Sequence, residues 1–253
     1  MTETKEKAVA PKKNDDAIIK ELLANAPPVE EVAVELPSKN KFYKLLNPSN
    51  PITLRPMNFE DEKSIASNKN VNQNVLNVLL SRCINNVDVR SILLFDKLFL
   101  LLKLREISYG TEYKVTLSCP ACRKDNQIVF DLTQLGVNYI EDELTNPTSM
   151  KLPILKKSVK VRLPRVNDEH YLNNVDEITA NLWRFVEEIE GHTKKTIISE
   201  VLKNLPLKDI HTLLDVLQGS RYGVDTKVRF ACNYCTHNEI TDLPITADFF
   251  TVN

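Results

Sequence analysis

The stretch YKVTLSCPACRKDNQIVFDL, residues 113–132, has a second version later in the chain, TKVRFACNYCTHNEITDLPI, residues 226–245. In each version a Cys-x-x-Cys pair and a polar turn stand between two alternating segments, which predicts a β-hairpin with both cysteines at its tip. The two versions align without a gap from a shared Tyr-Gly onward, at residues 109–110 and 222–223. We expect the two hairpins to contribute to one common structure.

The two pairs supply four thiols, those of Cys119, Cys122, Cys232 and Cys235. Two knuckles that face each other give a tetrahedron of thiolates, which suits zinc. Four protein ligands leave no open position for water, so we expect a structural zinc site. His237 could replace one cysteine as a ligand, although an exposed turn histidine is the simpler interpretation.

Two other interpretations use the same cysteines. A redox pair would stand at the N-terminus of a helix, where the helix dipole lowers the thiol pKa, but a turn and a strand follow Cys122. Two separate knuckles without metal are the second alternative, because Arg123 and Thr236 stand where zinc knuckles often have glycine.

The segment between the two pairs, residues 123–231, exceeds ordinary zinc-ribbon spacing and must be a folded insertion whose ends return to one place. Helical patterns cover about residues 167–219 within it, including residues 168–190, and residues 58–67, 72–87 and 91–107 before the first hairpin. We therefore predict an α+β fold, with a zinc-ribbon-like four-cysteine site joining small β-hairpins, helices before it and a helical insertion between the knuckles. Cys83 falls on the apolar face of its helix and is expected in the core.

Residues 1–40 differ from the rest of the chain, because they contain eight acidic and six basic residues and no aromatic residue or glycine. Such a segment buries too little apolar surface to offset its chain entropy. We predict a disordered N-terminal arm over residues 1–40, in which residues 15–26 could form an amphipathic helix on a partner. Residues 41–253 then form one globular domain.

Charge and hydropathy exclude several classes of protein. The net charge of -1 gives no general attraction to nucleic acid or anionic lipid. The most apolar run, residues 91–104, contains three charged residues and is shorter than the roughly 20 residues of a membrane span. The N-terminus lacks a secretory apolar region, so we expect reduced cysteines.

The sequence also lacks the common catalytic patterns. It has no Gly-rich phosphate loop, no His-Glu-x-x-His motif and no nucleophile elbow, and its four histidines are not at metal-ligand spacing. Six basic residues between 151 and 165 could bind phosphate, but lysines on an edge strand also prevent aggregation. We therefore predict that the protein is not an enzyme.

Three stretches in order carry a family resemblance: ITLRPMNFEDEKSI (52–65), DKLFLLLKLREISYGTEYKVTLSCPACRKDNQIVFDL (96–132) and LKNLPLKDIHTLLDVLQGSRYGVDTKVRFACNYC (202–235). Over about residues 38–250 the chain resembles the T4-like bacteriophage baseplate hub family, the small hub and hub-assembly proteins of contractile-tailed phages. The resemblance implies a non-enzymatic component or assembly factor, a chaperone, of the central baseplate hub. It further implies that other phage baseplate hub proteins are the partners, and that the protein acts in the host bacterial cytoplasm during assembly. Two outcomes stay open at this point: the protein remains in the virion baseplate, or it leaves as an assembly chaperone.

A zinc-ribbon nucleic-acid-binding protein is the alternative function. Such a protein would gather basic and aromatic side chains around its knuckles, whereas the two tips here have mixed charge and Tyr234 as their one large aromatic residue. At the chain end, Phe249 and Phe250 could belong to the core or bind a partner, and we retain them as candidate partner-binding residues.

Overall fold

The computed structural model describes residues 13–24, 30–67, 73–217, 221–245 and 247–250. The chain divides into two units, residues 1–30 and residues 31–253. The first unit contains α1 (Lys13–Leu23), an amphipathic helix with exposed Ile18, Ile19 and Leu22. The helix predicted at residues 15–26 is thus present, two residues earlier at its start. The predicted disorder of residues 1–12 and 25–29 lies outside the described residues.

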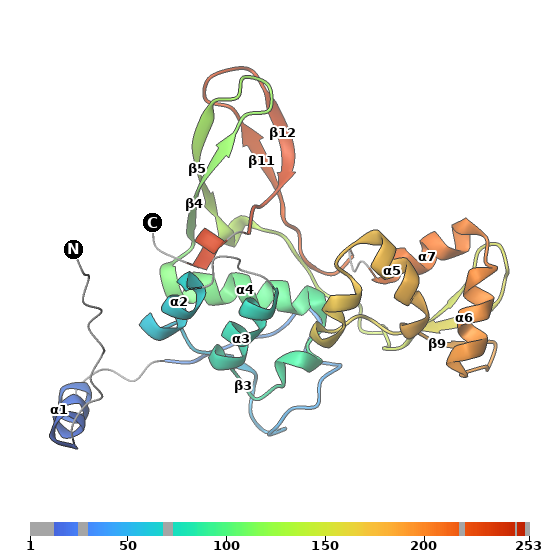
Figure 1. Ribbon diagram of the computed structural model, residues 1–253, viewed down its shortest axis with the longest axis horizontal. Helices are drawn as coiled ribbons and strands as arrows, with labels where there is room; N and C mark the ends of the chain where they lie inside the picture. Colours follow the sequence, from blue (N-terminus) through green and yellow to red (C-terminus); the bar gives the residue numbers. More distant parts are fainter. Residues whose placement is uncertain (1–12, 25–29, 68–72, 218–220, 246, 251–253) are drawn as a thin grey trace, which may run out of the picture. The chain divides into compact units, whose positions relative to one another are not determined.

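The second unit has an α+β fold of helices and small antiparallel sheets, which confirms the predicted class in its general form (Figure 1). Its elements in chain order are β1 (Val32–Ala33), β2 (Thr53–Leu54), α2 (Phe59–Ala66), α3 (Gln73–Cys83), β3 (Ile84–Asn85), α4 (Leu94–Tyr109), β4 (Glu112–Ser118), β5 (Asp125–Asp131), β6 (Val137–Asn138), β7 (Thr148–Lys151), β8 (Ser158–Val161), α5 (Val175–Asn181), β9 (Val186–Ile189), α6 (Lys195–Lys203), α7 (Leu207–Leu217), β10 (Gly223–Val224), β11 (Lys227–Ala231) and β12 (Asn238–Asp242). Short 3-10 helices lie at Val89–Ser91, Leu132–Gln134, Val166–Tyr171, Leu182–Arg184 and Ala247–Phe250. Among the helices described, none is long and apolar enough to cross a membrane.

The first hydrophobic core surrounds α4. The helix α2 begins with a capping box, in which Asn58 and Asp61 bind each other's backbone N–H groups, and α4 ends at Gly110 with a φ of 87°. Buried side chains of β2, β3, α3 and α4 pack together with Val34 and Leu36, which follow β1, and Phe249 and Phe250 join them from the end of the chain. Cys83 is fully buried in this core, as predicted.

Residues 31–40 belong to the folded unit and not to the arm that we predicted to reach residue 40. The strand β1 pairs with β2, and Val34 and Leu36 are buried in the first core. These residues are ordered by a tertiary contact: β1 forms because β2 supplies hydrogen-bond partners for its backbone. The composition of residues 1–40 cannot show such a contact.

A buried carboxylate holds the chain after β1 against α4. The side chain of Asp96, in the first turn of α4, accepts hydrogen bonds from the backbone N–H of Ser38 at 3.0 Å and from the Tyr43 hydroxyl. The Tyr43 hydroxyl in turn accepts a hydrogen bond from the backbone N–H of Leu93 at 3.0 Å. Burial raises the pKa of Asp96 to about 6, and it outweighs the hydrogen bonds from Ser38 and Tyr43, which lower it.

The insertion has its own core, which differs from the predicted helical module at 167–219. Residues 168–190, predicted as one helix, instead form a 3-10 turn, α5, a second 3-10 turn and the strand β9. Val186 and Ile189 are buried, and β9 pairs with β8 in the three-stranded sheet β7–β8–β9. Pairing with β8 therefore overrides the helical propensity of this segment.

The strand of the basic segment, β8, is not a sheet edge as we expected, because it is the central strand of its sheet; only Lys151 of the segment lies in the edge strand β7. Two of the six basic residues have acidic partners on neighbouring elements. Lys160 lies 2.8 Å from Glu188, and the Arg162 guanidinium binds both oxygens of the buried Asp168 at 2.7 and 2.8 Å. The observed role of these two basic residues is to join β8 to the elements beside it.

Backbone pairing closes the insertion at its base. The strand β6 pairs with β10, so that Asn138 lies opposite Gly223 although the whole insertion separates them in sequence. Gly223 has a φ of 88°, and a Cβ atom there would lie 2.9 Å from the Cβ of Phe95. The shared Tyr-Gly of the repeat thus gives two glycines with positive φ, each immediately before a hairpin.

Candidate metal centre

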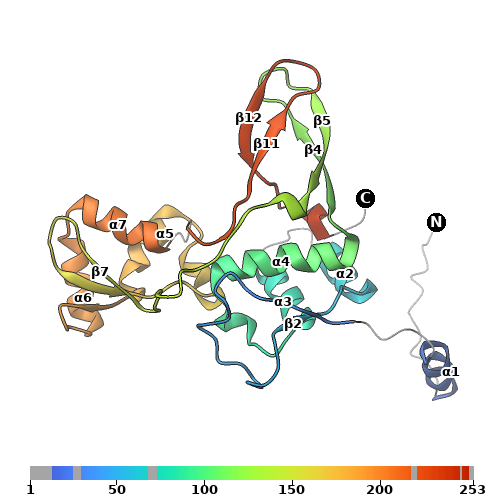
Figure 2. The same cartoon turned by 180° about the vertical axis from the view of Figure 1, so that it is seen from behind.

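The two predicted hairpins are present and lie side by side, with their turns at the same end (Figures 1 and 2). In the first hairpin β4 pairs with β5, from Glu112 opposite Asp131 to Ser118 opposite Asp125. In the second, β11 pairs with β12, from Lys227 opposite Asp242 to Ala231 opposite Asn238. Each Cys-x-x-Cys pair therefore lies in the connection between two paired strands.

The four predicted cysteines meet at the tips of the hairpins. Their sulfur atoms all lie within 4.8 Å of one another. Two of these distances join one hairpin to the other: 3.8 Å between the sulfurs of Cys119 and Cys235, and 3.7 Å between those of Cys122 and Cys232. These distances far exceed a disulfide bond of about 2.05 Å, and all four are free thiols. The distant halves of the sequence repeat thus form one cluster.

Backbone hydrogen bonds shape both knuckles. In the first, the N–H of Cys119 binds the carbonyl of Lys124 at 2.9 Å, and the N–H of Arg123 binds the carbonyl of Cys119 at 2.8 Å. Arg123 has a φ of 59°, so it adopts the left-handed conformation usual for the glycine that we noted as missing. In the second, the N–H of Cys232 binds the carbonyl of His237 at 3.0 Å. The lack of glycine therefore does not prevent either turn.

A buried amide links the two knuckles. Asn126 is fully buried; its Oδ1 accepts the backbone N–H of Asn233 in the other hairpin at 2.7 Å, and its Nδ2 donates to the carbonyl of Lys124 at 2.9 Å. Our sequence interpretation missed this residue. A signal exists, because alternation along β5 places Asn126 on the same face as Ile128 and Phe130, where a polar side chain needs a partner. The tips also meet through Lys124, whose ammonium lies 4.9 Å from the Tyr234 ring centroid.

The crowded thiols differ in acidity. Burial disfavours the Cys232 thiolate, but hydrogen bonds from the backbone N–H groups of Tyr234 and Cys235 and from neighbouring thiols outweigh burial and lower the pKa of Cys232 to about 6. For Cys235, a hydrogen bond from the backbone of His237 favours the thiolate. Burial and the hydrogen bonds to the other three thiols oppose it and raise the pKa of Cys235 to about 12. The cluster therefore releases the proton of Cys232 readily and retains that of Cys235, as expected when thiolates share one small volume.

Four soft sulfur donors within one coordination sphere could hold a metal ion. All four positions of a tetrahedral ion would then be taken by protein, which is the arrangement of structural sites. His237 lies beside the cluster, but its Nε2 is 3.5 Å from a carboxylate oxygen of Glu239. The structure thus brings together the four cysteines named from the sequence, in a group that could hold a metal ion.

The remaining candidate residues lie elsewhere. Phe249 and Phe250 are both fully buried; the Phe249 ring stands edge-on to Tyr113 at 4.8 Å and to Phe250 at 4.9 Å. Both side chains therefore have the core position that the sequence analysis allowed, and their binding of a partner stays a prediction. Cys83 is not one of the clustered cysteines; it lies in the first core, where burial raises the pKa of its thiol to about 11.

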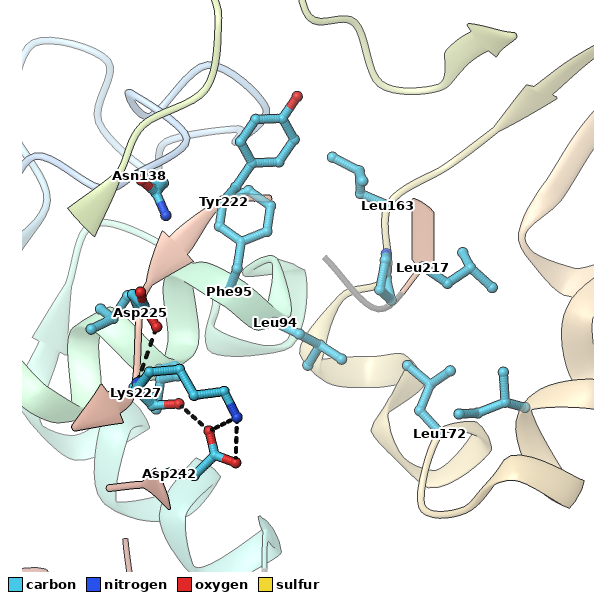
Figure 3. Close-up of a pocket in the computed structure, with 15 residues that line it drawn as sticks. Leu94, Phe95, Asn138, Leu163, Leu172, Leu217, Tyr222, Asp225, Lys227 and Asp242 are labelled. Carbon is cyan, nitrogen blue, oxygen red and sulfur yellow. Dashed lines mark hydrogen bonds and ion pairs between the residues drawn. The ribbon is translucent and has the colours of Figure 1, made fainter. Parts of the chain in front are cut away.

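A cavity of about 570 Å³ lies between the two hydrophobic cores (Figure 3). Leu94 and Phe95 of α4 line one wall, and the leucines of the insertion line the other: Leu163, Leu172 and Leu217. At its edge Lys227 and Asp242 form an exposed ion pair at 2.9 Å. The apolar walls identify this cavity as a gap between two separately packed cores.

A comparison with protein families finds one match, to a family described as T4 bacteriophage base plate protein, over residues 29–251. Neither a curated protein nor a solved structure matches the chain. The matched range includes the whole folded unit from β1 to the buried aromatic pair at the chain end, and both hairpins.

Proposed function

The chain belongs to the T4 bacteriophage base plate protein family, and on this premise we propose that it is a non-enzymatic component or assembly factor of the central hub of the phage baseplate. Its partners are then other hub proteins, which it meets in the host bacterial cytoplasm during assembly. The observation that carries the proposal is the family match over nearly all of the folded unit, which indicates a structural or assembly role in the baseplate.

We further propose that the four cysteines hold zinc. In a regular tetrahedron with zinc–sulfur bonds of about 2.3 Å, the sulfurs are roughly 3.8 Å apart. The two distances between hairpins, 3.8 and 3.7 Å, fit this value, and every pair lies within 4.8 Å. Thiolate donors favour zinc over harder ions such as magnesium and calcium.

The arrangement supports a structural role for the site. Each hairpin supplies two ligands, so a bound ion would join the chain before the insertion to the chain after it. Tyr113 of the first hairpin is buried in the first core, and Val228 of the second hairpin packs against that core. A closed site of this type stabilises the protein that carries it, because the folding of such a site and the binding of the ion share one free energy. A protein that holds other subunits in place during assembly needs a rigid structure and does not need catalytic activity.

Complementation of a phage that lacks this gene tests the assembly role. The wild-type gene should restore complete baseplates and infectious particles, and tagged protein from infected cells should capture hub proteins. Mass spectrometry of purified virions then distinguishes a resident component from an assembly factor that leaves. Normal yields of infectious phage without the gene would refute the role.

Metal analysis tests the zinc site separately. Protein purified without added metal should contain about one equivalent of zinc. Less than about a tenth of an equivalent of any thiophilic metal in folded protein would exclude the site. This result would leave the assembly role open, because the two proposals rest on different observations.

A further inference from the structure

An arginine and two aromatic rings form a cluster at the surface of the insertion. The guanidinium carbon of Arg184 lies 4.2 Å from the centroid of the Tyr171 ring and 4.4 Å from that of the Trp183 ring. Both distances are within the roughly 6 Å over which a ring face attracts a cation. The three side chains are half-buried, and both rings pack against the core of the insertion. The guanidinium therefore has a fixed base.

A hydrogen bond sets the orientation of this guanidinium. Its Nε donates to the Oδ1 of Asn181 at 2.9 Å, and the Nδ2 of Asn181 donates to the backbone carbonyl of Glu177 at 2.9 Å. The amide of Asn181 is thus bound to the backbone of α5 on one side and to Arg184 on the other. A side chain that is already ordered loses less conformational entropy when it binds a partner. The two rings and the amide therefore prepare Arg184 for an interaction.

The terminal nitrogens of Arg184 are not used within the described part of the protein. Among the residues that the structure describes they have no hydrogen-bond acceptor and no ion-pair partner, and they are open to solvent. The structure describes four other arginines whose side chains are buried or half-buried, and each of them donates a terminal N–H to a carbonyl or carboxylate oxygen: Arg55, Arg105, Arg162 and Arg165. Arg184 is therefore fixed as these arginines are, but its terminal N–H groups face solvent.

The chemistry of this guanidinium favours a carboxylate. Its terminal N–H groups match the two oxygens of a carboxylate, which gives a bidentate, charge-assisted contact. A chain of nucleic-acid phosphates would need several unpaired cations in a row. Instead the neighbouring elements carry acids, Asp176 and Glu177 on α5 and Glu187 on β9. Arginine, tryptophan and tyrosine are also the residue types enriched at the centre of protein–protein interfaces. The occupant that fits is therefore one carboxylate of a protein.

We propose that Arg184, in its cluster with Tyr171 and Trp183, binds the carboxylate of an aspartate or glutamate side chain of another protein. That carboxylate accepts two parallel hydrogen bonds from the terminal nitrogens of Arg184. The inference deepens the proposed function, on which it rests for the source of the partner. Its test uses a synthetic peptide and the isolated full chain, so failure here is distinct from failure of the phage complementation.

The single tryptophan of the chain supplies the measurement, because Trp183 lies against the proposed site. In isotope-labelled protein its indole N–H gives one NMR signal, whose shift is followed as the end-capped peptide Ala-Leu-Glu-Leu-Ala is added. A matched peptide has glutamine in place of glutamate. The glutamate peptide should give a saturable shift, and the glutamine peptide should bind at least about fivefold more weakly, because it lacks the charge. A thymidine oligonucleotide should also bind more weakly than the glutamate peptide, since the neighbouring acids repel a polyanion.

Three variants complete the test, and circular dichroism checks that each of them is folded. Arg184→Gln and Arg184→Lys should each weaken binding of the glutamate peptide at least about fivefold, since lysine retains the charge but not the planar donor pair. Arg229→Gln, which removes an exposed arginine from β11, should leave binding unchanged. Equal binding of the two peptides, no saturable shift, tighter binding of the oligonucleotide, or full binding by either Arg184 variant would overturn the proposal. Equal weakening by Arg229→Gln would also overturn it, because general charge would then attract the peptide.

Discussion

Replacing Asn126 with Ala tests how the two knuckles are held together without changing any sulfur ligand. The substitution removes the acceptor for the backbone N–H of Asn233 and the donor to the carbonyl of Lys124. Both contacts are partly buried. An unsatisfied buried backbone group costs about 1–3 kcal/mol, and partial access of water reduces this cost, so we expect a total loss of about 2–4 kcal/mol in the free energy of unfolding.

The repeat supplies a matched control. Glu239 occupies the position in the second hairpin that Asn126 occupies in the first, but its side chain is exposed. Its contact is a surface pair with His237, which contributes about 0–1 kcal/mol. Glu239→Ala should therefore change stability little. Asn126→Asp should fall between the two, because it retains the acceptor for Asn233 and loses the donor to Lys124.

Urea unfolding followed by circular dichroism measures these differences, and metal analysis of each variant shows whether the sulfur cluster is unchanged. We expect Asn126→Ala to retain metal with a lower midpoint of unfolding. The Asn126→Ala variant could instead lose less than about 0.5 kcal/mol in its free energy of unfolding, or lose no more than Glu239→Ala does. Either result would show that the amide does not hold the two knuckles together.

Four other outcomes are expected. Cys119→Ser should lower metal content and stability together, whereas Cys83→Ser should retain metal at a core-packing cost of roughly 1–3 kcal/mol; equal metal content in both variants would contradict the site. Phe249→Ala should lower the free energy of unfolding by about 3–5 kcal/mol in urea titration, since the ring is fully buried; a neutral result would instead favour partner binding by this residue. Burial raises the pKa of Asp96 to about 6, so the stability that this group contributes is complete below about pH 4 and is lost as the pH rises through 6. Asp96→Asn should reduce this fall, of up to on the order of 2–3 kcal/mol, in unfolding measured from pH 4 to 7; an unchanged profile would assign the slope to other groups. Limited proteolysis of the isolated protein should cut within residues 1–30 before the folded unit, and protection of this whole segment would contradict the predicted arm.

The sequence predicted the hairpins and the sulfur cluster because their signals are local. Alternation along β4 and β5 and the Cys-x-x-Cys spacing are both contained in about twenty residues. The helical patterns of residues 58–67 and 91–107 predicted α2 and α4 for the same reason. The similarity between residues 113–132 and 226–245 then indicated that these two distant segments belong to one structure. A single local pattern gives no such information.

The errors fall where distant contacts decide the structure. Residues 186–189 form β9 because β8 is available beside them, and residues 31–40 fold because β2 and Asp96 bind their backbone. The aromatic pair at the chain end left two interpretations open for the same reason, since nothing in its sequence shows that Tyr113 will pack against it. Partners that lie far away in sequence must be known before such segments can be assigned.

The pairing of β6 with β10 at the base of the insertion has a mechanical consequence. A tensile load that enters through the first hairpin and leaves through the second would pass across this pairing, and across the sulfur cluster if it holds zinc as proposed, and not along residues 139–222. The insertion would therefore remain unstretched while the rest of the chain carried the force. The helices α5, α6 and α7 lie on this segment, which would keep its shape under load.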